Sequence, residues 1–193
     1  MQILGSVKSQ ERDGRCGSSS KDKCRCATPC AHPEATAPVL LLGLGNPLMG
    51  DDGAGQALLT RLSSSAPEWG ETVEFVDGGT QGLALLGVFE KRRAVVFLDA
   101  ISLGDKAGAV HVLKGEELLH MGGRATTAHE GSAPQILTAL ELLGETPKEI
   151  VMIGVEPEKI GLGIGLSPTV AAAIDSAAEI ARTTISSILN DSK

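Results

Sequence analysis

Aromatic side chains and positive charge are both scarce in this sequence of 193 residues. Aromatics make up 2% of it, with no Tyr, and 17 Lys and Arg stand against 24 Asp and Glu, for a formal net charge of −7. Nucleic-acid binding usually needs basic side chains that neutralise phosphates and rings on which bases stack. Anionic lipid likewise attracts basic clusters. The composition therefore argues against nucleic acid or a membrane surface as a partner.

Long apolar runs are also missing. The longest, such as residues 38–42, are far shorter than the roughly 20 residues that span a bilayer. The N-terminus has no apolar segment followed by a cleavage site, the pattern typical of a secretory signal. We therefore expect a cytoplasmic protein.

Cysteine is confined to the first 30 residues. This segment is polar and rich in Gly and Ser, so it has too little apolar surface to offset the entropy lost on ordering. We predict that residues 1–37 are a disordered extension and that 38–193 form one domain. A thiolate metal site or a redox role is the alternative, although the spacing of Cys24, Cys26 and Cys30 is not a usual zinc pattern. The predicted domain contains no thiol nucleophile.

Within the domain, short aliphatic runs alternate with helical stretches, which is typical of βαβ units. We expect strands at 39–43, 72–76, 94–99 and 149–155 and a shorter edge strand at 109–113. Helices are predicted at 54–62, from the turn at 77–80 to 90, at 132–143 and at 168–188. The pattern predicts an α/β fold with three α/β/α layers and a doubly wound, mostly parallel sheet of about five strands.

Polar residues follow three of these strands: Asn46 with Asp51 and Asp52 after the first, Asp77 after the second, and Asp99 at the end of the third. Ligands of open α/β sheets bind beyond the carboxyl ends of the strands. A single Asp there is often only a turn former or helix cap. Asp99 fits that explanation least, because it ends an apolar strand and needs partners when buried. Several converging carboxylates repel one another unless a cation or protons intervene, so a metal site is a natural hypothesis.

The glycine-rich stretch 43–55 excludes two common sites. A dinucleotide motif would require Gly where Leu48 stands, and the double acid would repel a pyrophosphate. A P-loop would require Gly-Lys-Ser/Thr. The opening Gly-Leu-Gly-Asn-Pro is similar to that of peptidyl-tRNA hydrolases, but that family has a His shortly afterwards, and none occurs here between His32 and His111.

Four further segments carry distinct patterns. They are Asp-Gly-Gly-Thr-Gln-Gly at 77–82, Val-Phe-Leu-Asp-Ala at 96–100, Thr-Ala-His-Glu at 127–130, and Gly-Val-Glu-Pro at 154–157 followed by Leu-Ser-Pro at 166–168. Together with 43–55, and in this order, they resemble the hydrogenase maturation endopeptidases, the M52-type family that trims nickel–iron hydrogenase large subunits. The resemblance covers most of residues 39–188 and implies a phosphorylase/hydrolase-like fold.

The resemblance also implies a site. It assigns Asp52, Asp99 and His129 as nickel ligands and as the catalytic residues. Two carboxylates and one imidazole accommodate Ni²⁺ without excluding other divalent ions. The nickel is implied to belong to the substrate, a hydrogenase large-subunit precursor from which a C-terminal extension is cleaved.

Supporting roles around the metal are expected for Asn46, Asp51 and Asp77. We expect a monomer. Two other functions remain open at this stage: a nickel-binding sensor or delivery module without proteolysis, and a peptidyl-tRNA hydrolase-like enzyme.

Overall fold

The computed structural model describes residues 38–64, 66–120 and 132–191. The predicted extension 1–37 lies outside these ranges, and so does His129, so neither prediction is tested by the structure.

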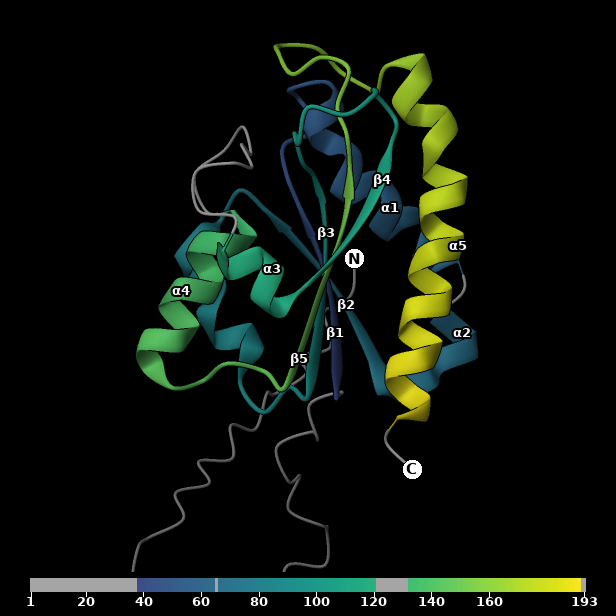
Figure 1. Cartoon of the computed structure of the whole chain (residues 1–193). Helices are drawn as coiled ribbons and strands as arrows, with labels where there is room; N and C mark the ends of the chain where they lie inside the picture. The colour runs from purple at the N-terminus through teal and green to yellow at the C-terminus, as the bar shows by residue number, and fades with distance from the viewer. Residues whose placement is uncertain (1–37, 65, 121–131, 192–193) are drawn as a thin grey trace, which may run out of the picture. The chain divides into compact units, whose positions relative to one another are not determined.

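Within the described residues, five strands form one sheet, as predicted. They are β1 (Val39–Leu44), β2 (Val73–Gly79), β3 (Ala94–Ala100), β4 (Val110–Lys114) and β5 (Glu149–Val155). Their order in the sheet is β2-β1-β3-β5-β4. All neighbouring pairs are parallel except β4 with β5, so the predicted edge strand is the antiparallel one. The carboxyl ends of β1, β2, β3 and β5 therefore meet at one edge, at the top of Figure 1.

Helices cover both faces of the sheet, which confirms the three-layer α/β/α prediction (Figure 1). One face carries α1 (Ala54–Ser63), α2 (Ala66–Trp69) and α5 (Pro168–Asn190). The other face carries the 3-10 helix η3 (Gly82–Phe89), α3 (Gly115–His120) and α4 (Ala133–Leu143). No helix within the described ranges is long and apolar enough to cross a membrane.

Side chains that alternate between the two faces of the sheet form two hydrophobic cores. In β1, Val39 and Leu41 belong to the core beneath α1 and α5, whereas Leu40, Leu42 and Leu44 belong to the core beneath α4 and η3. Successive side chains of a strand point to opposite faces, and both faces here are covered. This explains why the sequences of the central strands are almost unbroken runs of apolar residues.

The segment after β2 differs from its prediction. The strand continues to Gly79, so Asp77 lies in the strand and not in a turn after it. The helix predicted up to Glu90 is a 3-10 helix that ends at Phe89. Gly82 and Gly87 lie within it, and glycine disfavours a continuous α-helix. The helices α2 and α3 were not predicted, because four and six residues are too short to establish a helical period.

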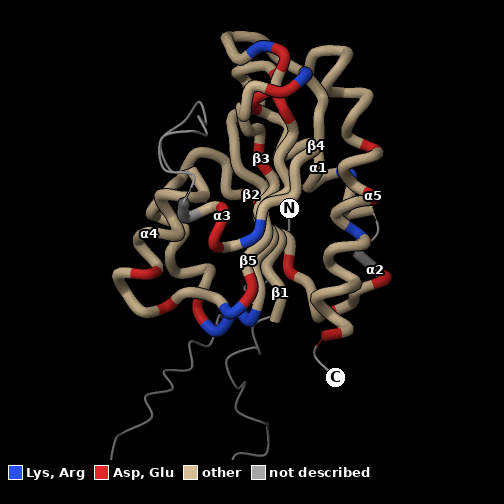
Figure 2. Tube along the Cα trace, viewed as in Figure 1, with Lys and Arg blue, Asp and Glu red and all other residues tan. Residues whose placement is uncertain are grey.

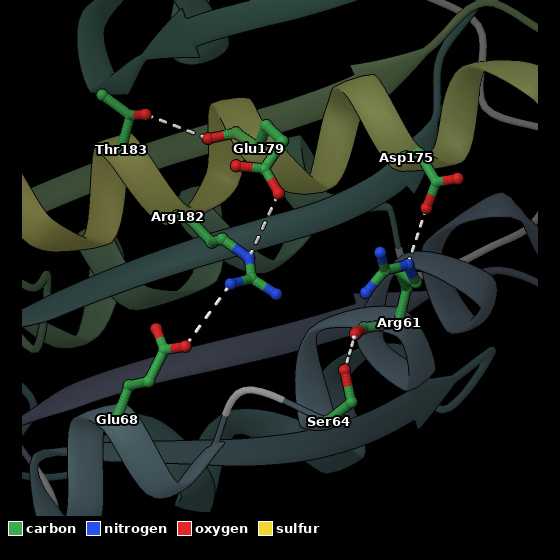
Figure 3. Close-up of polar contacts among 7 residues, drawn as sticks. All are labelled: Arg61, Ser64, Glu68, Asp175, Glu179, Arg182 and Thr183. Carbon is green, nitrogen blue, oxygen red and sulfur yellow. Dashed lines mark hydrogen bonds and ion pairs between the residues drawn. The ribbon is translucent and has the colours of Figure 1, made fainter.

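The long helix α5 is joined to its neighbours by ion pairs, drawn in Figure 3. Arg61 of α1 donates through Nε to Asp175 Oδ1 at 2.6 Å. Arg182 lies 3.5 Å from Glu68 of α2 and 3.6 Å from Glu179 of its own helix. Exposed pairs of this kind contribute about 0–1 kcal/mol each to the free energy of unfolding. We therefore expect them to orient α5, while the buried apolar face of α5 holds the helix on the sheet.

Candidate active site

Asp99 lies at the carboxyl edge of the sheet, as the strand pattern predicts. β1 and β3 pair in parallel up to Gly43 opposite Leu98, so Asp99 follows the last residue of β3 that pairs with β1. On the other side of β3, Asp99 still pairs with Gly154 of β5. Its side chain is fully buried, and Oδ1 accepts a hydrogen bond from the Ala100 N–H at 2.8 Å. The structure therefore holds a carboxylate in the interior at the point where two central strands end.

Asp52 reaches the same edge through a glycine-dependent turn. It belongs to the 3-10 turn η1 (Asp51–Gly53), which contacts β3 and leads into α1. A Cβ on Gly55 would stand 2.2 Å from the Leu44 carbonyl oxygen and 2.4 Å from that of Leu98. Only glycine allows the first turn of α1 to lie so close to both strand ends. Asp52 is 1% exposed, so a second buried carboxylate lies at this edge.

Asn46 shapes the loop that holds Asp52. Its backbone N–H donates to Asp52 Oδ2 at 2.8 Å, and its side-chain Oδ1 accepts from the Leu48 N–H at 3.0 Å. Its carbonyl accepts from the Met49 N–H. These local bonds fold the segment back on itself and orient one oxygen of the Asp52 carboxylate.

Asp51 has a different set of partners, all in the loop before α5. Its Oδ2 accepts from the backbone N–H groups of Glu158 and Lys159, each at 2.9 Å, and its Oδ1 accepts from the Ser167 N–H at 2.6 Å. We call this set the Asp51 clamp. Burial alone would raise the pKa of Asp51, but the hydrogen bonds from Ser167, Lys159 and Glu158 outweigh it and hold this pKa below its usual value of 3.8.

Backbone hydrogen bonds extend the clamp along both loops. The Gly50 N–H donates to the Gly163 carbonyl at 2.9 Å, and the Gly163 N–H donates to the Leu48 carbonyl at 3.0 Å. The Gly161 N–H donates to the Met49 carbonyl at 3.2 Å. The loop after β1 and the loop before α5, far apart in sequence, are thus joined into one framework.

Glu156 holds a second loop, a role that its sequence pattern did not reveal. The carboxylate accepts from the N–H groups of Leu103 and Gly104 and from the Ser102 hydroxyl, at 2.8 to 3.1 Å. His111 Nε2 of β4 lies 3.4 Å away. Glu156 is 3% exposed and fixes the segment that follows Asp99. The available signal was an acid directly after the apolar run 150–155, because such an acid must find partners when buried.

Asp77 lies at the same edge but faces outward. It pairs with Gly43 in the sheet, its side chain is exposed, and its Oδ1 accepts from the Gly79 N–H at 3.1 Å. Gly79 in turn accepts from the Gly45 N–H, which ties the ends of β2 and β1 together. In the described residues, the Asp77 side chain thus bonds to the backbone at the end of its own strand.

The structure brings Asp52 and Asp99 to one edge, and His129 lies outside its described ranges. Within 38–64, 66–120 and 132–191 no three His, Cys, Asp or Glu side chains are grouped so as to hold a metal ion. The loops above the strand ends carry both signs of charge, for example Asp105 beside Lys106 and Glu158 beside Lys159 (Figure 2). Among the described residues of these loops, exposed acids thus alternate with bases.

Comparison with known proteins agrees with these motifs. The family model described as hydrogenase maturation protease matches residues 59–184. The hydrogenase 2 maturation protease of Escherichia coli K12 is 35% identical over 144 residues, covering 73% of this chain and 86% of that protein. The hydrogenase expression/formation protein HupD of Rhodobacter capsulatus is 32% identical over 149 residues, covering 76% of this chain and 69% of that protein.

Solved structures show the same fold. The hydrogenase maturating endopeptidase HybD from E. coli matches with a TM-score of 0.68 and 32% identity, over 77% of this chain and 92% of that one. The hydrogenase maturation protease HybD from Thermococcus kodakarensis matches with a TM-score of 0.63 and 32% identity, over 76% and 97%. The resemblance drawn from the motifs is confirmed: this chain belongs to the hydrogenase maturation proteases and is an endopeptidase of that family.

Proposed function

We propose that this endopeptidase removes a C-terminal extension from the nickel-loaded large-subunit precursor of a nickel–iron hydrogenase, acting as a monomer in the cytoplasm. In this proposal Asp52, Asp99 and His129 bind the nickel that the substrate carries. The observation that supports it most is the presence of two buried carboxylates where β1 and β3 end side by side, in a chain of this family.

The chemistry of these groups suits a divalent cation. Negative charges buried at one edge of a sheet repel each other unless a positive charge compensates them. A bound cation would supply that charge beside Asp52 and Asp99. With the imidazole of His129 they would offer two oxygens and one nitrogen, which leaves positions on the metal open for the substrate's own ligands.

The residues of the enzyme then have separate tasks. Asp52 and Asp99 bind and orient the metal, Asn46 orients Asp52, and Glu156 fixes the segment after Asp99. A metal held in this way can polarise a carbonyl or activate water. Residues 38–193 contain no Cys and no Gly-x-Ser-x-Gly elbow. We therefore expect processing to resist thiol-directed and serine-directed inhibitors.

The test uses the purified full-length protein with precursor in nickel-loaded and nickel-free forms. Mass spectrometry of the precursor should show loss of a C-terminal peptide from the nickel-loaded form alone. Full cleavage of the nickel-free form would contradict metal recognition. An unchanged mass together with transfer of nickel between the two proteins would instead establish a sensor or delivery module.

A further inference from the structure

An apolar groove lies beside the loop that carries Asp52. Its volume is about 520 Å³, within the range of about 300–1,000 Å³ typical of ligand pockets. The walls are almost entirely apolar and come from the loop after β1, from α1, and from the loop before α5 with the start of that helix. They include Pro47, Gly53, Ala57, Ile164, Leu166 and Ile174.

Large apolar side chains are exposed on the two loops that line this groove, and we call these side chains its rim. Leu162 is 93% exposed, Ile164 is 89% exposed and Leu48 is 58% exposed. All three belong to the two loops that are joined by the hydrogen bond from the Gly163 N–H to the Leu48 carbonyl. Exposed apolar side chains gathered on two joined loops are typical of an interaction site, in contrast to apolar residues scattered singly.

The Asp51 clamp holds the rim in place. The Asp51 clamp fixes the loop before α5 at both of its ends, at Glu158 and Lys159 and again at Ser167. Leu162 and Ile164 lie between these two anchors. The apolar side chains are therefore presented on a preformed support, which reduces the entropy lost when a partner binds.

Two lining residues of the groove are chain neighbours of candidate site residues. Pro47 and Gly53 line it, and they flank Asn46 and Asp52 in the chain. Arg61 is in the lining too, but its charge is compensated by Asp175 at 2.6 Å (Figure 3). The lining thus favours an uncharged, apolar occupant, and one whose chain continues towards Asp52.

We propose that this groove and its rim dock an extended apolar segment of the hydrogenase large-subunit precursor. The inference rests on the proposed function for the identity of the substrate. Docking supplies affinity for the protein part of the substrate, whereas Asp52 and Asp99 engage its metal. The groove should accordingly bind the precursor with or without nickel.

The test is the double variant Leu162→Ser/Ile164→Ser in the full-length protein. Both side chains are almost fully exposed, so their loss removes docking surface and leaves the core intact. The matched control is Leu142→Ser, at a leucine that is 85% exposed at the end of α4, on the opposite face of the sheet (Figure 1). Thermal unfolding should give the same melting temperature for all three proteins.

Binding is measured by calorimetry with nickel-free precursor. The double variant should raise Kd about tenfold or more, as expected for the loss of two apolar contacts, and Leu142→Ser should leave it unchanged. With nickel-loaded precursor, KM should rise by a similar factor while kcat changes less than about twofold. An unchanged Kd in the double variant, or an equal rise in the control, would overturn the docking site.

Two further outcomes are decisive. If the wild-type protein binds the precursor through the groove but cleaves neither form, the proposed function fails and the docking site stands. If the wild-type protein sediments as a dimer that Leu162→Ser/Ile164→Ser dissociates, a second copy of this chain occupies the groove and the proposal is overturned.

Discussion

Asp51 and Asp52 are neighbours in one turn and both are buried, yet their carboxylates face different parts of the molecule. Asp51 accepts three backbone N–H groups from the loop before α5. Asp52 accepts from Asn46 in its own loop and lies at the edge where β1 and β3 end. The two neighbouring acids therefore have different roles. Asp51 joins the two loops, and Asp52 lies with Asp99 at the candidate site.

The largest expected effect concerns the site. Asp99→Ala should lower the rate of precursor processing at least about a hundredfold, because it removes a proposed metal ligand together with its charge. Asp99→Asn keeps the shape but binds a metal more weakly, so it should also block processing. Mass spectrometry of nickel-loaded precursor measures both.

The control for Asp99 is Asp105→Ala, which removes the same charge from an exposed position in the following loop. It should process normally. The melting temperatures of the Asp99 variants should stay within a few degrees of wild type, and unimpaired processing by Asp99→Ala would show that the acidic pair does not carry the function.

The next effect concerns the Asp51 clamp. Asp51→Asn should lower the free energy of unfolding by about 3 kcal/mol, because three hydrogen bonds to a buried carboxylate are weakened or lost. Asp52→Asn weakens the bond from the Asn46 N–H, which joins residues of one loop, so it should lower the free energy of unfolding by less than Asp51→Asn does while abolishing processing. Urea unfolding followed by circular dichroism gives both values. An equal fall in the free energy of unfolding of the two variants would contradict the different roles proposed for Asp51 and Asp52.

Acid should weaken the same clamp. The pKa of Asp51 is lower in the folded protein than its usual value of 3.8, so its stabilising contribution is complete above that value and is lost as the pH falls through the folded pKa. The difference in unfolding free energy between wild type and Asp51→Asn should be constant from about pH 8 to 5 and shrink below about pH 4. Urea titrations across this range measure it. A difference that shrinks near neutrality would contradict the assignment.

The smallest effect is expected at the N-terminus. Deleting residues 1–37 should change the melting temperature by less than about 2 °C, because this polar segment offers the core almost no apolar surface. Differential scanning calorimetry of the truncated and full-length proteins measures the change. A fall of many degrees would mean that the segment packs on the domain.

Much of the fold is predictable because the central strands are buried on both faces. The predicted strand at 149–155 coincides with β5, and the run ending at Asp99 lies within β3. The edge position of β4 follows from its shorter, more polar sequence. The 3-10 form of η3 and the short helices α2 and α3 depend on local backbone geometry. The spacing of apolar residues in the sequence does not predict that geometry.

The site is predictable only in part. The rule that parallel strands end together places Asp52 and Asp99 at one edge from sequence alone. The clamp could not be foreseen, since Asp51 bonds to residues more than 100 positions away. Glu156 is similar: its partners lie in the loop after β3, and only the folded chain brings them to it.

The most direct measurement is nickel K-edge X-ray absorption of the nickel-loaded precursor, recorded alone and freeze-quenched with the protein. Binding should add oxygen and nitrogen neighbours to the nickel at roughly 2 Å, the range of metal–carboxylate and metal–imidazole bonds. Asp99→Ala should add fewer of them, whereas Asp105→Ala should reproduce the wild-type spectrum. A spectrum that the wild-type protein leaves unchanged while the precursor is cleaved would contradict recognition of the metal by Asp52 and Asp99.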